Sequence, residues 1–148
     1  MPPLDDATRR LLSNATGVGS RFLETLALEL AEILSVRWVL LAEAQDPDLS
    51  GVATLAFVER TALRPSTSYS LGGTASAEVI RRGRPLSVPR LLDQQYVADA
   101  GLGEAKSYVG VPLRDEGGHC MGILAVLHDR PLEDPAWNEV LLTGRPLV

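Results

Sequence analysis

The pattern of apolar and polar positions is clearest from residue 107 to residue 132, where it predicts a β-hairpin. Residues 107–114 and 119–128 are rich in valine, leucine and isoleucine, and the Asp-Glu-Gly-Gly sequence at 115–118 supplies the turn between them. The second strand is apolar at both alternations, with Met121, Ile123, Ala125 and Leu127 on one face and Cys120, Leu124 and Val126 on the other. Such a strand is expected at the centre of a sheet that is covered on both faces.

Two amphipathic helices are predicted near the start of the chain. Residues 4–15 carry acidic residues early and basic residues late, as the helix dipole favours. The stronger pattern runs from residue 22 to residue 34, where apolar residues recur at three- and four-residue intervals. Its apolar stripe consists of Phe22, Leu23, Leu26, Leu30, Ile33 and Leu34. This stripe predicts a helix that packs on a sheet.

A second hairpin and a short helix are predicted in the middle of the chain. The apolar runs 36–42 and 52–59 are separated by turn residues, and a short strand is expected at 69–71. Thr74 is the expected N-cap of a helix over residues 75–82, which ends at Gly83.

The remaining segments give weaker signals. Two prolines allow only a brief edge strand at 85–89. Residues 90–106 show no periodicity, and loops of that length are often functional or mobile. A last helix is predicted from Asp134 to about residue 142, and residues 143–148 are expected to be a tail or a truncation point.

Together these elements predict one α+β domain. We expect a central antiparallel sheet of five or six strands, with the N- and C-terminal helices on one face. The helix at 75–82 and the loop at 90–106 would cover the other face. A sheet covered by irregular structure is a common place for a small-molecule pocket.

Composition and charge exclude several classes of function. With 14 basic and 19 acidic residues the net charge is −5, which argues against a protein that binds nucleic acid by neutralising phosphates. No apolar run approaches the roughly 20 residues that span a bilayer, and the N-terminus does not resemble a signal peptide. A single cysteine excludes an intramolecular disulfide and fits a reducing compartment. We therefore expect a cytoplasmic protein with no membrane insertion.

Several local sequences, in order along the chain, resemble the GAF domain, a sensory module of signalling proteins that is built on a PAS-like scaffold. They are FLETL at 22–26, LAEIL at 30–34, YSLGGT at 69–74, EVIRRGRPL at 78–86, SYVGVPL at 107–113 and GILAVLHD at 122–129. The resemblance covers about residues 16–142 and leaves 1–15 as an N-terminal extension.

The resemblance implies a ligand pocket between the sheet and the short helix. The residues expected around it are Phe57, Tyr69, Thr74, Ala75, Glu78, Leu92, Tyr96 and Tyr108. Backbone N–H groups after Gly72-Gly73-Thr74 could hold an anionic group of a ligand, because a helix N-terminus offers unpaired donors. The alternative, that Thr74 only caps the helix, is favoured.

GAF domains bind cyclic nucleotides, bilins, haem and small metabolites, and many have no known ligand, so the resemblance identifies no cofactor. Free methionine sulfoxide reductases are GAF proteins that need a second cysteine, and Cys120 has none. We expect Cys120 to be buried in its strand, and its position does not match a bilin-binding cysteine. For haem, His119 is expected to be solvated, and His128 to cap the strand or pair with Asp129.

The expected function is non-catalytic: a GAF regulatory domain that binds a small molecule and signals to a fused or partner output module. The alternative is a GAF domain without a ligand that serves as a homodimerisation module through helices at 4–34 and 134–142. A reductase-like enzyme is the least favoured reading.

Overall fold

The computed structural model describes residues 20–45 and 50–132. The helices predicted at 4–15 and 134–142, and the tail at 143–148, lie outside the described residues. The elements are α2 (Ser20–Leu34), β1 (Trp38–Ala44), β2 (Gly51–Glu59), β3 (Ala62–Leu63), β4 (Ser68–Ser70), α3 (Ala75–Arg82), β5 (Leu86–Val88), α4 (Leu92–Gln95), the 3₁₀ helix η1 (Asp99–Gly101), β6 (Ser107–Arg114) and β7 (Cys120–His128). Within these residues no helix has the length and apolar character needed to cross a bilayer.

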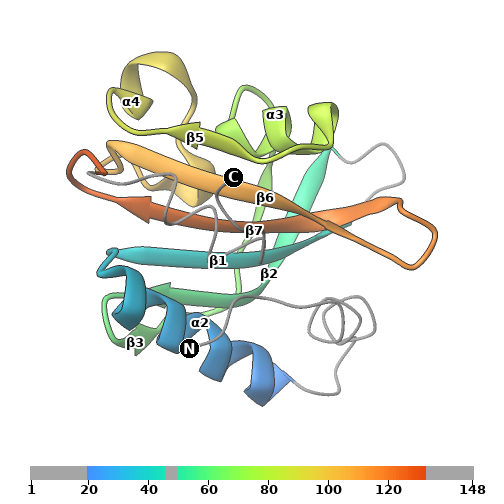
Figure 1. The fold of residues 1–148 in the computed structure, drawn as a ribbon, viewed down its shortest axis with the longest axis horizontal. Helices are drawn as coiled ribbons and strands as arrows, with labels where there is room; N and C mark the ends of the chain where they lie inside the picture. Colours follow the sequence, from blue (N-terminus) through green and yellow to red (C-terminus); the bar gives the residue numbers. More distant parts are fainter. Residues whose placement is uncertain (1–19, 46–49, 133–148) are drawn as a thin grey trace, which may run out of the picture.

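The strands form one antiparallel sheet in the order β3-β2-β1-β7-β6-β5, and β4 also pairs with β2 (Figure 1). The predicted α+β class is therefore confirmed. The sheet has seven strands rather than five or six, because β3 also pairs with the edge of β2 that β1 leaves free. The short strand expected at 69–71 is β4, whereas the two residues of β3 are too few for an apolar alternation to reveal them.

The predicted hairpin is the pair β6–β7, and residues 122–127 of β7 are buried between two covered faces as expected. The alternation of side chains between the two faces of β7 breaks at one point. Arg114 pairs with Cys120 and Leu113 with Gly122, so Met121 is the extra residue of a β-bulge. Met121 consequently packs on the α2 side, and its prediction on the same face as Ile123 is wrong.

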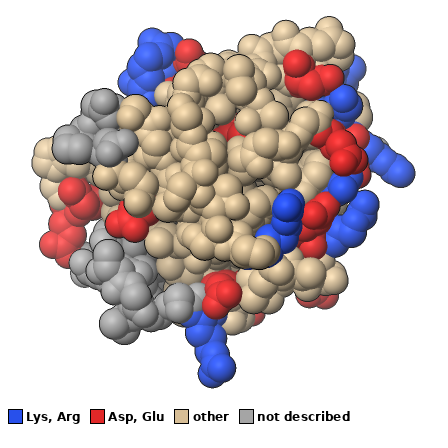
Figure 2. Space-filling model, turned by 180° about the vertical axis from the view of Figure 1, so that it is seen from behind, with Lys and Arg blue, Asp and Glu red and all other residues tan. Residues whose placement is uncertain are grey.

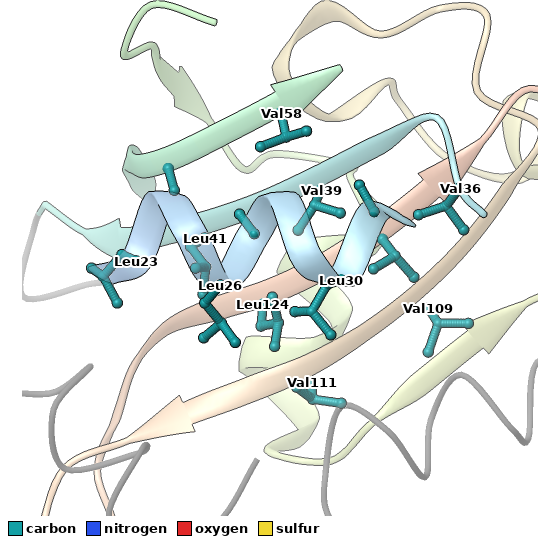
Figure 3. Close-up of a cluster of buried hydrophobic side chains, with 14 of the residues drawn as sticks. Leu23, Leu26, Leu30, Val36, Val39, Leu41, Val58, Val109, Val111 and Leu124 are labelled. Atoms are coloured by element: carbon teal, nitrogen blue, oxygen red, sulfur yellow. The ribbon is translucent and has the colours of Figure 1, made fainter. Parts of the chain in front are cut away.

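On one face of the sheet, α2 packs against the central strands (Figure 3). Leu23, Leu26 and Leu30 point from the helix toward Leu41 and Leu124 of β1 and β7. Leu34 also packs against this cluster, whereas two members of the predicted stripe differ from expectation. Phe22 and Ile33 are 42% and 41% exposed, because they lie at the margins of the stripe, beyond the surface that the strands cover.

On the opposite face, a second buried apolar layer lies beneath α3, α4 and residues 96–106, and we call it the α3 layer. Its buried members are Trp38, Leu40, Ala42, Val52, Phe57, Leu71, Ala75, Val79, Val88, Leu92, Leu102, Ala105, Tyr108, Ile123, Ala125 and Leu127. The loop predicted at 90–106 contains α4 and η1, whose four and three residues are too few to show a helical period.

Candidate functional site

Four polar side chains from four elements meet inside the α3 layer, and we call them the polar cluster. Tyr69 of β4 donates its hydroxyl hydrogen bond to Asp99 Oδ2 at 2.8 Å. Ser76 Oγ of α3 lies 2.9 Å from the hydroxyl of Tyr108 in β6. Asp99 is 2% exposed, and Ser76 and Tyr108 are fully buried. Buried polar groups need hydrogen-bond partners. Here the hydrogen bonds of Asp99 connect the 96–106 segment to Tyr69 of the sheet and to Ser76 of α3.

The N-terminus of α3 is occupied by groups of the chain itself. Thr74 Oγ1 accepts from the N–H of Ala77 at 3.1 Å, so its predicted role as N-cap is confirmed. The N–H of Ser76 donates to Asp99 Oδ1 at 3.5 Å. The carboxylate of Asp99 therefore lies where the sequence suggested an anionic ligand group, and the helix dipole favours it there.

Burial raises the pKa of Asp99, and the hydrogen bonds from Ser76 and Tyr69 offset this only in part. Burial, followed by the charge of Asp99, also raises the pKa of Tyr69 and of Tyr108. Both phenols therefore stay neutral hydrogen-bonding groups at ordinary pH. The cluster can supply a carboxyl group and three hydroxyl groups in an apolar surrounding, where each polar contact is strong.

The ring of Tyr108 lies along β6 above Gly110. A Cβ atom on Gly110 would come within 2.6 Å of Tyr108 Cε1, so only glycine leaves room for the ring. Beside Gly110 in the sheet is Ala125, another small residue. Two small residues thus make a hollow in this face of the sheet, and Tyr108 fills it.

Six of the eight residues expected around the pocket lie in or against the α3 layer, and a seventh, Thr74, is buried beside it at the start of α3. Phe57, Ala75, Leu92 and Tyr108 are buried members, Tyr69 and Tyr96 pack against them, and Thr74 is 2% exposed. Glu78 instead forms an ion pair with Arg81 at 2.6 Å. The sequence analysis missed Ser76 and Asp99. For Asp99 the available signal was an acidic residue within the apolar sequence Val-Ala-Asp-Ala at 97–100.

A cleft of about 330 Å³ opens beside the polar cluster. Its walls are Arg37, Trp38, Glu59, Arg64 and residues 100–104. Trp38 and Leu102 belong to this wall and also to the α3 layer, and Ala100 packs against that layer, so the cleft and the layer share these three residues. Trp38 Nε1 is buried without a hydrogen-bond partner among the described residues.

Arg37 holds the outer side of this turn. Its guanidinium bonds to Glu59 at 2.8 Å, and to Glu104 and Asp129 at 3.1 Å each. It also lies 4.3 Å above the ring of Trp38. The 99–104 segment is thus attached through Asp99 on the inside and through Glu104 on the outside.

A GAF domain family model matches residues 20–143 of the chain. The chain belongs to the GAF domain family. A search of curated proteins finds no match to it.

Solved structures similar to this GAF domain include regulatory domains and enzymes. The type II free methionine-R-sulfoxide reductase from Thermoplasma acidophilum has a TM-score of 0.70 and 16% identity, covering 90% of this chain and 88% of that one. The Nlh2 GAF domain of A. aeolicus, in an inactive state, has a TM-score of 0.63 and 15% identity, covering 90% and 81%. Residues 122 to 287 of a methyl-accepting chemotaxis protein have a TM-score of 0.60 and 18% identity, covering 82% and 80%. At these identities the likeness shows a shared fold.

Residues suited to covalent or metal chemistry lie away from the polar cluster of this GAF domain. Cys120 is half-buried at the start of β7, more exposed than expected because the β-bulge lies beside it, and burial raises the pKa of its thiol. His119 is exposed beside Asp115, and Nδ1 of His128 accepts the N–H of Arg37, so the solvated and capping roles expected for them are confirmed. Among the described residues no three His, Cys, Asp or Glu side chains gather as a metal site.

Asp99 should change the pH dependence of stability in an unusual direction. Because its pKa is higher in the folded protein than the roughly 3.9 of an unfolded chain, its contribution to the free energy of unfolding falls as pH rises from about 4 through the folded pKa. We expect the difference between wild type and Asp99→Asn, measured by urea unfolding, to decrease with pH. Asp93 is the control, since its bond to Lys106 lowers its pKa and the difference for Asp93→Asn should increase with pH. Parallel curves for the two variants would contradict this assignment.

Proposed function

We propose that this GAF domain is a non-catalytic sensor that binds a small molecule in the α3 layer and passes the bound state to a fused or partner output module. The polar cluster is the observation that carries this proposal. Asp99, Tyr69, Ser76 and Tyr108 place a carboxyl group and three hydroxyl groups inside an otherwise apolar layer. A few convergent polar groups on an apolar wall are typical of ligand sites.

The covering segment supports a mechanism of population shift. Residues 92–106 are attached to the rest of the domain through the side chains of Asp99 and Glu104, and the Asp93–Lys106 ion pair joins the two ends of the segment. A ligand that binds within the polar cluster would change the inner attachment at Asp99 and keep the outer one at Glu104. We propose that this shifts the segment relative to the sheet and that the terminal helices transmit the change.

A thermal-shift screen tests the proposal. Nucleotides, tetrapyrroles, amino acids and aromatic metabolites are added to the full chain, and a ligand is expected to raise the melting temperature by binding the folded state. For any compound that does so, the largest amide chemical-shift changes should fall at residues 69–76 and 92–108, with smaller ones in α2. The absence of any shift across the screen, or changes confined to α2, would refute binding in this layer.

A second candidate function, homodimerisation without a ligand, rests on the outer surface of α2. Phe22 and Ile33 are large apolar side chains that remain exposed there. The helices predicted at 4–15 and 134–142, which the sequence suggested for the same role, lie outside the described residues. Sedimentation of wild type and of Phe22→Ser/Ile33→Ser compares the two proposals. A dimer that the double substitution dissociates favours this one, and a monomer at high concentration counts against it.

The distribution of charged side chains on the surface indicates which classes of partner the domain could bind. On the face shown in Figure 2, charged side chains lie mainly toward the margin and the middle is largely uncharged. This distribution supports a small-molecule or protein partner rather than nucleic acid, whose backbone is bound by clustered basic residues. We also propose a reducing cytoplasmic setting for the single thiol of Cys120.

A reductase-like activity is the least supported candidate. The structural likeness to free methionine-R-sulfoxide reductases is one of fold, and thiol-disulfide turnover needs a resolving thiol that this sequence does not contain. We expect no reduction of free methionine sulfoxide beyond that seen with Cys120→Ser. Turnover that disappears in Cys120→Ser would overturn the non-catalytic proposal.

A further inference from the structure

The charge of Asp99 has no counter-ion among the described residues. Its two partners, the hydroxyl of Tyr69 and the N–H of Ser76, are both neutral, and it forms no ion pair with any described basic side chain. Other carboxylates of the chain differ in this respect. Asp93 pairs with Lys106, and Glu59 pairs with Arg37 and Arg64. A buried carboxylate without a cation is costly, so the site is complementary to a positive charge that the described chain does not supply.

The surroundings of Asp99 suit an organic cation better than a metal ion. Tyr69 and Tyr108 are themselves part of the polar cluster, and Tyr96 and Phe57 lie in or against the same layer. Aromatic faces attract ammonium and guanidinium groups, whereas a divalent metal needs several oxygen, nitrogen or sulfur ligands. With one carboxylate and hydroxyl groups, the polar cluster offers too few ligands for a metal ion.

The cleft provides an approach to this position. Its charges balance, because Arg37 and Arg64 form ion pairs with Glu59 and Glu104, so a cation is not repelled at the entrance. Its inner wall is the turn Ala100–Gly101, whose residues have φ values of +51° and +73°. Ala100 and Gly101 directly follow Asp99 in η1, so movement of this turn would displace the wall of the cleft next to Asp99.

We propose that Asp99 anchors the positively charged nitrogen of a small ligand, a primary ammonium or an amidinium, which reaches it from the cleft as the 99–102 turn opens. Tyr69 is the positioning residue that orients the carboxylate toward the cation. This inference rests on the proposed sensing function and names the chemical class of its ligand.

The test uses four probes that share one ring size and differ in charge: benzylamine, benzamidine, benzyl alcohol and benzoate. Isothermal titration compares wild type with Asp99→Asn, which keeps the shape and the acceptor for Tyr69, and with Asp93→Asn, which removes a carboxylate from the same segment. We expect the two cations to bind wild type about tenfold or more tighter than benzyl alcohol. Asp99→Asn should abolish this preference and Asp93→Asn should retain it.

A second measurement does not depend on any variant folding. The pKa of Asp99 in the wild-type protein is followed through its carboxyl ¹³C chemical shift, and benzylamine should lower it, because a nearby cation favours the ionised form. Equal binding of all four probes, a preference that survives Asp99→Asn, or an unchanged pKa in saturating benzylamine would each overturn the cationic class. A neutral or anionic compound from the screen that perturbs residues 92–108 would then leave the sensing function intact, whereas failure of the whole screen would remove both proposals.

Discussion

The substitution Gly122→Ala is expected to lower the free energy of unfolding by about 3 kcal/mol, the upper end of what overpacking costs. Gly122 lies in β7 between Glu43 of β1 and Leu113 of β6. A Cβ atom at this position would come within 3.1 Å of the carbonyl carbon of Ala42 and of Glu43 Cα, and nearer still to the carbonyl oxygen of Ala42. These atoms are backbone of a paired strand, so no side chain can rotate away to make room.

The close approach has a local cause. The β1–β2 pair shifts register between Leu41 and Ala42, and the β6–β7 pair shifts between Leu113 and Arg114. Both irregularities fall at the same end of the sheet, where the extra twist of bulged strands brings backbones together.

Chemical denaturation of the wild type and two alanine variants measures this effect. Gly103→Ala is the control, because nothing lies within 4 Å of its added Cβ and its φ is not positive. We expect Gly103→Ala to change stability by less than about 0.5 kcal/mol, as surface substitutions usually do. Similar values for the two variants would show that β1 and β7 are not as closely paired at Gly122 as the structure indicates.

The order of the elements was predictable because their apolar periods are long. The fifteen residues of α2 and the eight- and nine-residue strands β6 and β7 each repeat their pattern several times. The caps of α3 were predictable for a different reason, since Thr74 and Gly83 have conformational preferences that depend on few neighbours.

The candidate site was harder to predict because it depends on contacts between distant segments. Asp99 and Tyr69 are 30 residues apart, and Ser76 and Tyr108 are 32 apart, so no local pattern links them. A residue that the chain buries as a polar partner looks, in the sequence, like any residue of a loop. The four predicted aromatic residues lie in or against the α3 layer, whereas Asp99 was not among the predicted residues.

The substitution Gly110→Ala is expected to lower the free energy of unfolding by about 2 kcal/mol through its effect on Tyr108. The added methyl group would meet the Tyr108 ring and force it off the floor of the α3 layer. The hydroxyl of Tyr108 would then leave Ser76, so the variant also alters the proposed ligand site. The cost is smaller than at Gly122 because a side chain, unlike a paired strand, can move.

A double-mutant cycle with Tyr108→Leu identifies the ring as the cause. Tyr108→Leu removes the ring, so Gly110→Ala added to it should cost little, and the coupling energy should be about 1–2 kcal/mol. Tyr108→Phe separates the hydroxyl from the ring, since it keeps the contact with Gly110 and loses the bond to Ser76. If the two substitutions are additive, Tyr108 does not lie over Gly110 in solution, and the hollow between Gly110 and Ala125 is open to a ligand without displacement of this ring.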